Sequence, residues 1–148
     1  MKKNLYDLYK TETELETGGV WQDFGDTRIK LARSGNKNTK YLKTFKQVMK
    51  KHNKANIEAL SEKEQDELMA EIFVKGVITA WESKDDKDKW VPGIVMPDDK
   101  GELSLTPFNL KNAQKCLLDL PDLFGELRNY ADDRKTFQKE VEEGQLKN

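Results

Sequence analysis

The sequence feature that most constrains the fold is the apolar stretch between Leu68 and Trp81. On a helical projection its large apolar side chains spread around most of the circumference instead of forming one stripe. They are Leu68, Met69, Ile72, Phe73, Val74, Val77, Ile78 and Trp81. A capping box, Ser61-Glu62-Lys63-Glu64, predicts that this helix begins at Ser61. A helix that is apolar on nearly every side has to be enclosed, so we expect residues 68–81 to form the central helix of the core.

The segment before it, residues 37–54, has a helical period with two contrasting faces. At about 100° per residue, its apolar side chains and His52 fall within an arc of roughly 120°. These are Tyr41, Leu42, Phe45, Val48, Met49 and His52. The lysines occupy the other side, so we expect a helix that packs on one face and is basic on the other.

Strand patterns flank these helices. Residues 20–24 and 27–33 read as two strands around the turn residues Gly25-Asp26, which predicts an N-terminal β-hairpin. Residues 82–105 form a charged excursion in which a second short hairpin, on an edge because of its prolines, is an open alternative to an irregular loop. Thr106-Pro107 predicts the start of a further helix that ends near Asp119. A last helix begins near Asp122 and carries an apolar stripe as far as Val141.

The expected fold is a mainly α (α+β) domain of about four helices, with the N-terminal hairpin and a possible second short hairpin. One domain over residues 1–148 accommodates this pattern, with residues 1–18 as a possible N-terminal arm and residues 142–148 as a frayed tail. The predicted core consists of Trp21, Ile29, Leu31, Phe45, Met49, Leu68, Ile72, Phe73, Ile78, Trp81, Leu117, Leu123, Phe124 and Leu127.

The residues available for chemistry are few. The chain has one histidine, His52, and one cysteine, Cys116, and neither sits in a nucleophile or zinc-ligand pattern. The glycines form no phosphate-binding loop, and the acidic clusters at 85–88 and 98–102 do not have the spacing of a calcium-binding EF-hand. No run approaches the roughly 20 apolar residues of a membrane span. We expect a protein that is not an enzyme, needs no cofactor or metal and contacts no membrane.

Charge is strongly segregated along the chain. Between Arg28 and Lys54 there are ten basic residues and no acidic one, while the whole chain has a net charge of −1, so the remainder carries −11. The basic residues are Arg28, Lys30, Arg33, Lys37, Lys40, Lys43, Lys46, Lys50, Lys51 and Lys54. We interpret them as a face that binds an acidic partner or the acidic part of a second copy. A solvated lysine face is the simpler alternative. Nucleic acid is an unlikely partner, because few exposed aromatics accompany the lysines.

Several segments, in order along the chain, resemble small proteins encoded among the tail genes of long-tailed, siphovirus-like phages. The segments are residues 19–35 (GVWQDFGDTRIKLARSG), 80–82 (AWE), 120–124 (LPDLF) and 147–148 (KN). Several such proteins are tail assembly chaperones. The resemblance implies a non-enzymatic factor of the host cytoplasm that keeps the tape measure protein soluble while tail tube subunits polymerise around it. It implies no catalytic residue.

Two other functions remain open at the level of sequence. The first is a structural neck or tail-completion protein of the virion, in which the polarised charge would hold the chain to its neighbours. The second is a non-specific nucleic-acid-binding protein that uses the lysine-rich helix.

Overall fold

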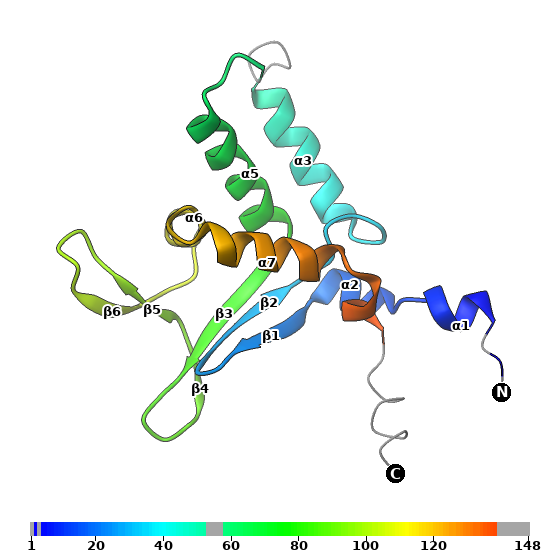
Figure 1. Cartoon of the computed structure of the whole chain (residues 1–148), viewed down its shortest axis with the longest axis horizontal. Helices are drawn as coiled ribbons and strands as arrows, with labels where there is room; N and C mark the ends of the chain where they lie inside the picture. The colour runs from blue at the N-terminus through cyan, green and yellow to red at the C-terminus, as the bar shows by residue number, and fades with distance from the viewer. Residues whose placement is uncertain (1, 3, 53–57, 139–148) are drawn as a thin grey trace.

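The computed structural model describes residues 2, 4–52 and 58–138. Its centre is a four-stranded antiparallel sheet in the order β1-β2-β3-β4 (Figure 1). The strands are β1 (Val20–Phe24), β2 (Thr27–Leu31), β3 (Ile78–Lys84) and β4 (Trp90–Pro92). β1 and β2 are the predicted N-terminal hairpin, which is confirmed, and Gly25 in its turn has a positive φ of 75°.

Helices pack on one side of this sheet and at one end of it. The helices α3 (Thr39–Lys51) and α5 (Glu62–Gly76) form an antiparallel pair at one end, and α6 (Leu110–Asp119) and α7 (Pro121–Asp132) lie across the sheet (Figure 1). A second sheet of two strands, β5 (Ile94–Pro97) and β6 (Leu103–Thr106), projects from the body. At the end of the molecule opposite this second sheet are α1 (Leu5–Tyr9) and α2 (Thr13–Gly18). A 3-10 turn at Arg134–Phe137 follows α7.

The main core lies between the inner face of the sheet and the helices. Ile29, Leu31 and Trp81 face inward from β2 and β3, and they meet Phe73 of α5 and Leu127 of α7. A smaller cluster, Val48, Leu68 and Ile72, joins α3 to α5. Most of the predicted core residues are buried, but Phe45 and Trp21 were wrongly placed. Phe45 is 37% exposed, because Thr44 and Val48 are the buried residues of α3. Trp21 is half-buried on the outer face of the sheet, where its ring lies against Arg28 and Lys30.

The prediction of a mainly α fold was wrong: six strands in two antiparallel sheets make the described structure α+β. The main cause is the stretch that was read as one central helix. The capping box at Ser61 is present, but α5 ends at Gly76 and the chain continues as the sheet strand β3. β-Branched Val77, Ile78 and Thr79 favour this change. The apolar residues spread around most of a helical circumference because residues 68–81 comprise the end of a helix and the start of a strand.

The excursion at 82–105 is largely strand. Its first residues complete β3, β4 pairs with them, and β5 pairs with β6 to form the second short hairpin. Because β6 extends to Thr106, the next helix begins later than predicted, at Leu110, with the Asn109 side chain accepting a hydrogen bond from Asn112 N at 2.8 Å. The predicted end of the last stripe at Val141, and the tail at 142–148, lie outside the described residues.

We expect Phe73→Ala to lower the free energy of unfolding by about 3–5 kcal/mol, because a large buried ring would leave a cavity. The Phe73 ring is almost fully buried and packs edge-on against Phe124, with 5.3 Å between centroids. Urea unfolding of the purified chain measures the loss. Phe45→Ala is the matched control and should cost less than about 1.5 kcal/mol, since that ring is partly in solvent already. Equal losses in the two variants would contradict this description of the core.

Candidate interaction surfaces

The ten basic residues predicted to form one partner-binding face are divided among three places. Arg33 and Lys37 lie where the chain passes from β2 to α3, and Arg28 and Lys30 lie on the outer face of the sheet. Five exposed lysines belong to α3: Lys40, Lys43, Lys46, Lys50 and Lys51. The tenth, Lys54, lies outside the described residues. The basic run is therefore not one continuous surface.

Arg33 forms an ion pair with a buried carboxylate, that of Glu16. Its guanidinium donates a hydrogen bond to the buried Glu16 carboxylate at 2.8 Å, and the same oxygen accepts a bond from the Asn36 side chain at 2.6 Å. Burial by itself raises the pKa of Glu16, but the hydrogen bonds from Asn36 and Arg33 outweigh it, so the pKa lies below its ordinary value of 4.5. Lys37 donates a bond to the Thr11 carbonyl at 3.1 Å. These contacts fasten α2 to the start of α3.

We expect Glu16→Gln to destabilise the fold by about 3–5 kcal/mol at pH 7, because it leaves the Arg33 charge without its buried partner. A carboxylate with a lowered pKa stabilises the fold above its unfolded pKa and loses that contribution as the pH falls through its folded pKa. The difference between wild type and Glu16→Gln should therefore shrink below about pH 4.5. Chemical unfolding at pH 7 and in acid measures it. Glu14→Gln, on the exposed side of the same helix, should change little at either pH.

On the outer face of the sheet, cations and indole rings alternate. The Arg28 guanidinium lies between Trp21 and Trp90, at 4.1 and 4.4 Å from the ring centroids. Lys30 lies over Trp21 at 5.6 Å and Lys84 over Trp90 at 5.2 Å. The Arg28 guanidinium also pairs with Glu82 on the neighbouring strand. The two rings are already stacked with cations of this chain, so they are poor platforms for nucleic-acid bases.

The projecting β5–β6 hairpin carries apolar residues on both faces of β5, whereas the inward-facing positions of β6 are the polar Ser104 and Thr106. Its inner face buries Ile94 and Met96 in the core. Its outer face carries two cross-strand pairs, Val95 with Leu105 and Pro97 with Leu103, and all four residues are exposed. Val95, Leu103 and Leu105 are 56%, 70% and 53% exposed. We call Val95, Pro97, Leu103 and Leu105 the apolar hairpin surface.

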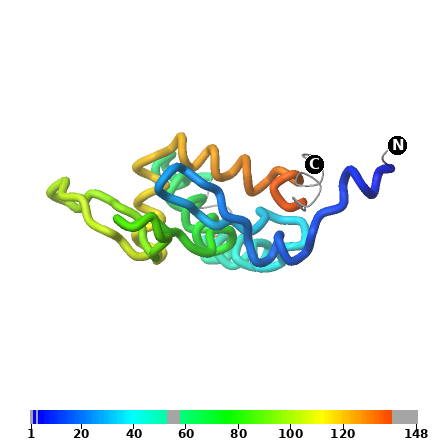
Figure 2. The backbone as a smooth tube through the Cα atoms, turned by 90° about the horizontal axis from the view of Figure 1, so that it is seen from below, coloured from blue at the N-terminus to red at the C-terminus, as the bar shows by residue number. Residues whose placement is uncertain are grey.

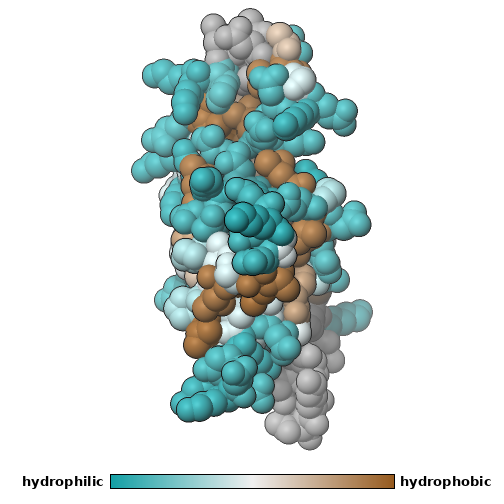
Figure 3. All heavy atoms as spheres, turned by 90° about the vertical axis from the view of Figure 1, so that its left-hand side faces the viewer, coloured by the Kyte–Doolittle hydropathy of each residue, from teal (hydrophilic) through white to brown (hydrophobic). Residues whose placement is uncertain are grey.

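Figure 3 faces this end of the molecule and shows apolar residues gathered around the hairpin. Leu118 and Leu120, close to the α6–α7 junction, are also exposed. A soluble monomer seldom shows a contiguous apolar patch of this kind without a binding role. Sequence reasoning missed the surface, although the unbroken apolar run Ile94-Val95-Met96 was a usable signal: a strand with one solvated face should alternate with polar residues.

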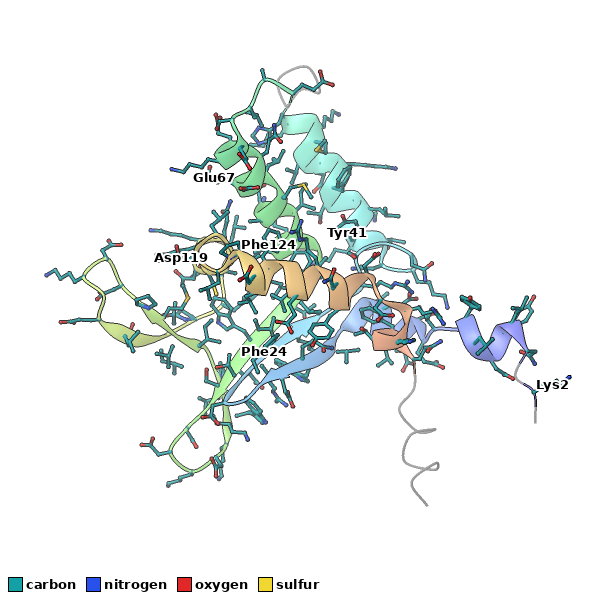
Figure 4. The ribbon with its side chains drawn as sticks, in the orientation of Figure 1. Lys2, Phe24, Tyr41, Glu67, Asp119 and Phe124 are labelled. Atoms are coloured by element: carbon teal, nitrogen blue, oxygen red, sulfur yellow. The ribbon has the colours of Figure 1, made fainter. Side chains whose placement is uncertain are left out.

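A cavity of about 360 Å³ lies beside the hairpin. Its wall is formed by β5, the inner face of the β1–β2 hairpin and the α6–α7 junction, and it includes Phe24, Ile29, Met96 and Leu123. Figure 4 shows the side chains of this region, with Phe24 and Asp119 labelled. Nearly all of the wall is apolar, and Asp119 is its one charged residue. Such a cavity suits apolar side chains of a partner better than a polar metabolite.

A second cleft, of about 390 Å³, separates the α3–α5 pair from α7. Tyr41 and Phe124, both labelled in Figure 4, line it together with the polar groups of Arg128 and Asp132. The Arg128 guanidinium lies over the Phe124 ring, 4.6 Å from its centroid. The mixed lining makes this cleft a less specific place for an apolar partner than the hairpin.

The two side chains considered for chemistry, Cys116 and His52, lie on α6 and at the end of α3. Cys116 is buried in α6 and lines the apolar cavity, and burial raises the pKa of its thiol, so the reactive thiolate is disfavoured. His52 is the half-buried residue that caps the end of α3. In the described part of the chain, no three His, Cys, Asp or Glu side chains are grouped to hold a metal ion. None of the described helices combines the length and apolarity needed to cross a bilayer.

Comparison with known proteins gives one family. No curated protein and no solved structure matches the chain. A family model described as YdaY prophage protein matches residues 35–148, which is most of the chain. The matched residues include the helices α3, α5, α6 and α7 and the apolar hairpin surface. The match supports the phage origin that the sequence resemblance implied. The chain belongs to the YdaY family of prophage proteins.

Proposed function

We propose that this protein is a non-enzymatic tail assembly chaperone of a phage, which binds the tape measure protein or tail tube subunits while the tail is built. Three observations support the proposal. The chain belongs to a prophage family, its segments resemble those of tail-gene proteins, and it presents an apolar surface suited to a protein client. The single observation that carries the proposal is the exposed outer face of the β5–β6 hairpin beside an apolar cavity.

The expected client exposes apolar stripes that would fit the apolar hairpin surface. A tape measure protein is a long helical chain, and before the tube encloses it, its apolar stripes face water. An amphipathic helix can lay such a stripe against the apolar hairpin surface and insert one or two side chains into the adjoining cavity. Each contact would be weak, but many chaperone copies along one long client hold it through repeated binding. This mode needs no catalytic residue and no cofactor.

The α3 lysines supply a second, electrostatic element in this proposal. They are exposed on a helix whose opposite side packs on α5, so they are available to acidic groups of a client. Long-range attraction of this kind raises the rate of association more than the affinity. The apolar hairpin surface would then supply most of the binding free energy.

We expect Leu103→Asp to abolish co-purification of the protein with the tape measure protein after co-expression, because a carboxylate on the apolar hairpin surface would have to be desolvated on binding. Leu42→Asn is the control: Leu42 is an exposed leucine, and the neutral substitution adds no negative charge beside the α3 lysines, so co-purification should remain intact. Circular dichroism checks that both variants fold. Full retention of the client by folded Leu103→Asp would refute this binding site. Finding the protein in purified virions would instead favour the alternative of a neck or tail-completion component.

A second experiment separates a protein client from nucleic acid. Reversing Lys40, Lys43 and Lys46 to Glu should weaken binding to the client, and the effect of salt on wild-type binding should level off once exposed charges are screened. Binding of the wild type to random-sequence duplex DNA should be undetectable at physiological salt. If wild-type affinity for DNA is high and its logarithm falls linearly with the logarithm of salt concentration, the nucleic-acid function is correct and the chaperone proposal fails.

A further inference from the structure

We infer that copies of this protein associate head to tail, with α1 of one copy docked on the apolar hairpin surface of the next. The partner is a second copy of this chain, so the inference does not depend on the proposed function. It rests on the exposure of α1, on how α1 is held, on where the two surfaces lie and on their charges.

The apolar side chains of α1 are largely exposed to solvent. None of its five residues is buried, and Leu5 and Tyr6 are 70% and 83% exposed. Leu5, Leu8 and Tyr9 have the i, i+3, i+4 spacing that places side chains on one side of a helix, and Tyr6, three residues before Tyr9, borders that side. A helix of this length gains little from its own hydrogen bonds, so apolar docking is the natural source of its stability.

The base of α1 is fixed to the body. Arg134 Nε and Gln138 Nε2 donate hydrogen bonds to the Leu8 carbonyl at 3.1 and 2.8 Å. The Arg134 guanidinium also lies over the Tyr9 ring, 4.4 Å from its centroid. The helix is therefore presented in a defined direction and not folded back onto its own core. A pre-positioned segment loses less conformational entropy when it docks.

The two surfaces lie at opposite ends of the long axis of the molecule. Figure 1 places α1 at one end and the β5–β6 hairpin at the other, and the view at 90° in Figure 2 shows the same separation. The helix cannot reach the hairpin of its own chain in this arrangement, so the contact has to join two copies. Because donor and acceptor are different surfaces, the association is heterologous and extends into chains of copies unless its rotation closes a ring.

The charges at the two ends are complementary. At the α1 end, the described residues 2 and 4–10 contain two lysines and one aspartate, a net charge of +1, whereas the hairpin turn at residues 98–102 contains Asp98, Asp99 and Glu102 against Lys100, a net charge of −2. Opposite charges beside an apolar contact steer the two surfaces together and disfavour the reversed pairings of α1 with α1 or hairpin with hairpin. This complementarity favours a second copy as the occupant of the hairpin surface when no client is bound, and a client would compete for the same surface.

Sedimentation velocity of the full chain tests the inference. The mean sedimentation coefficient should rise as the concentration increases between roughly 10 µM and 1 mM, because a small interface gives a weak complex. Tyr6→Asp on α1 and Leu103→Asp on the hairpin should each weaken the association by about tenfold or more, which corresponds to about 1.4 kcal/mol. Leu42→Asp, on the exposed side of α3, is the matched control and should associate like wild type.

Mixing the two defective variants gives the decisive result. Tyr6→Asp retains an intact hairpin and Leu103→Asp retains an intact α1, so an equimolar mixture should form a 1:1 dimer that cannot extend further and that associates about as tightly as wild type, although each variant alone associates much more weakly. Thermal unfolding confirms that both are folded. Monomeric wild type over the whole concentration range would overturn the inference, even if the protein binds a tail client. It would also fail if the mixture stays monomeric, or if either variant associates as strongly as wild type.

Discussion

The close approach of α3 to Gly76 is the constraint on which the rest of the structure depends. A Cβ at this position would lie 3.2 Å from the Tyr41 Cα, closer than nearly all ordinary Cβ contacts, so any larger side chain would require α3 to shift by a few tenths of an ångström. The buried Asn38 side chain donates hydrogen bonds to the carbonyls of Gly76 and Arg33, at 3.0 and 2.8 Å. It thereby joins the end of α5 to the loop that enters α3.

This junction also brings β3 beside β2. The Ala32 amide donates a hydrogen bond to the Val77 carbonyl at 2.8 Å, so the strand that follows α5 starts beside the end of β2. The pairing shifts register between Lys30 and Leu31, and beyond this irregularity Ile29 lies opposite Trp81, with both side chains in the core. The Trp81 ring nitrogen donates to the Thr106 carbonyl at 3.1 Å, which joins β3 to the end of the hairpin that carries the exposed apolar surface.

Sequence patterns predicted the elements whose signals are local. The alternation and turn residues at 20–31 gave the first hairpin, and the Ser61 capping box gave the start of α5, because each depends on residues a few positions apart. The end of α5 was not predictable in this way. Gly76 in a helical pattern is ordinarily tolerated, and only its close contact with Tyr41, from a helix far away in sequence, shows why glycine suits that position.

The candidate site was harder to predict for a related reason. A run of ten basic residues is continuous along the chain, but folding places Arg28 between two indole rings, Arg33 on a buried carboxylate and five lysines on α3. Basic residues that are close in sequence are therefore also grouped in space only along α3. The apolar hairpin surface shows the opposite case, because Val95 and Leu105 are neighbours only once β5 has paired with β6.

The two-faced hairpin connects stability with binding. Its inner residues, Ile94 and Met96, anchor it in the core, whereas Val95 and Leu103 on its outer face contribute nothing comparable to the stability of the monomer because they remain in water. Polar side chains at the outer positions would fold equally well and would protect the free edges of a two-stranded sheet from non-specific pairing. Retaining apolar residues there carries a cost in solubility that a covering partner removes. The outer face of the hairpin therefore contributes little to the stability of the monomer, as expected of the binding surface proposed above.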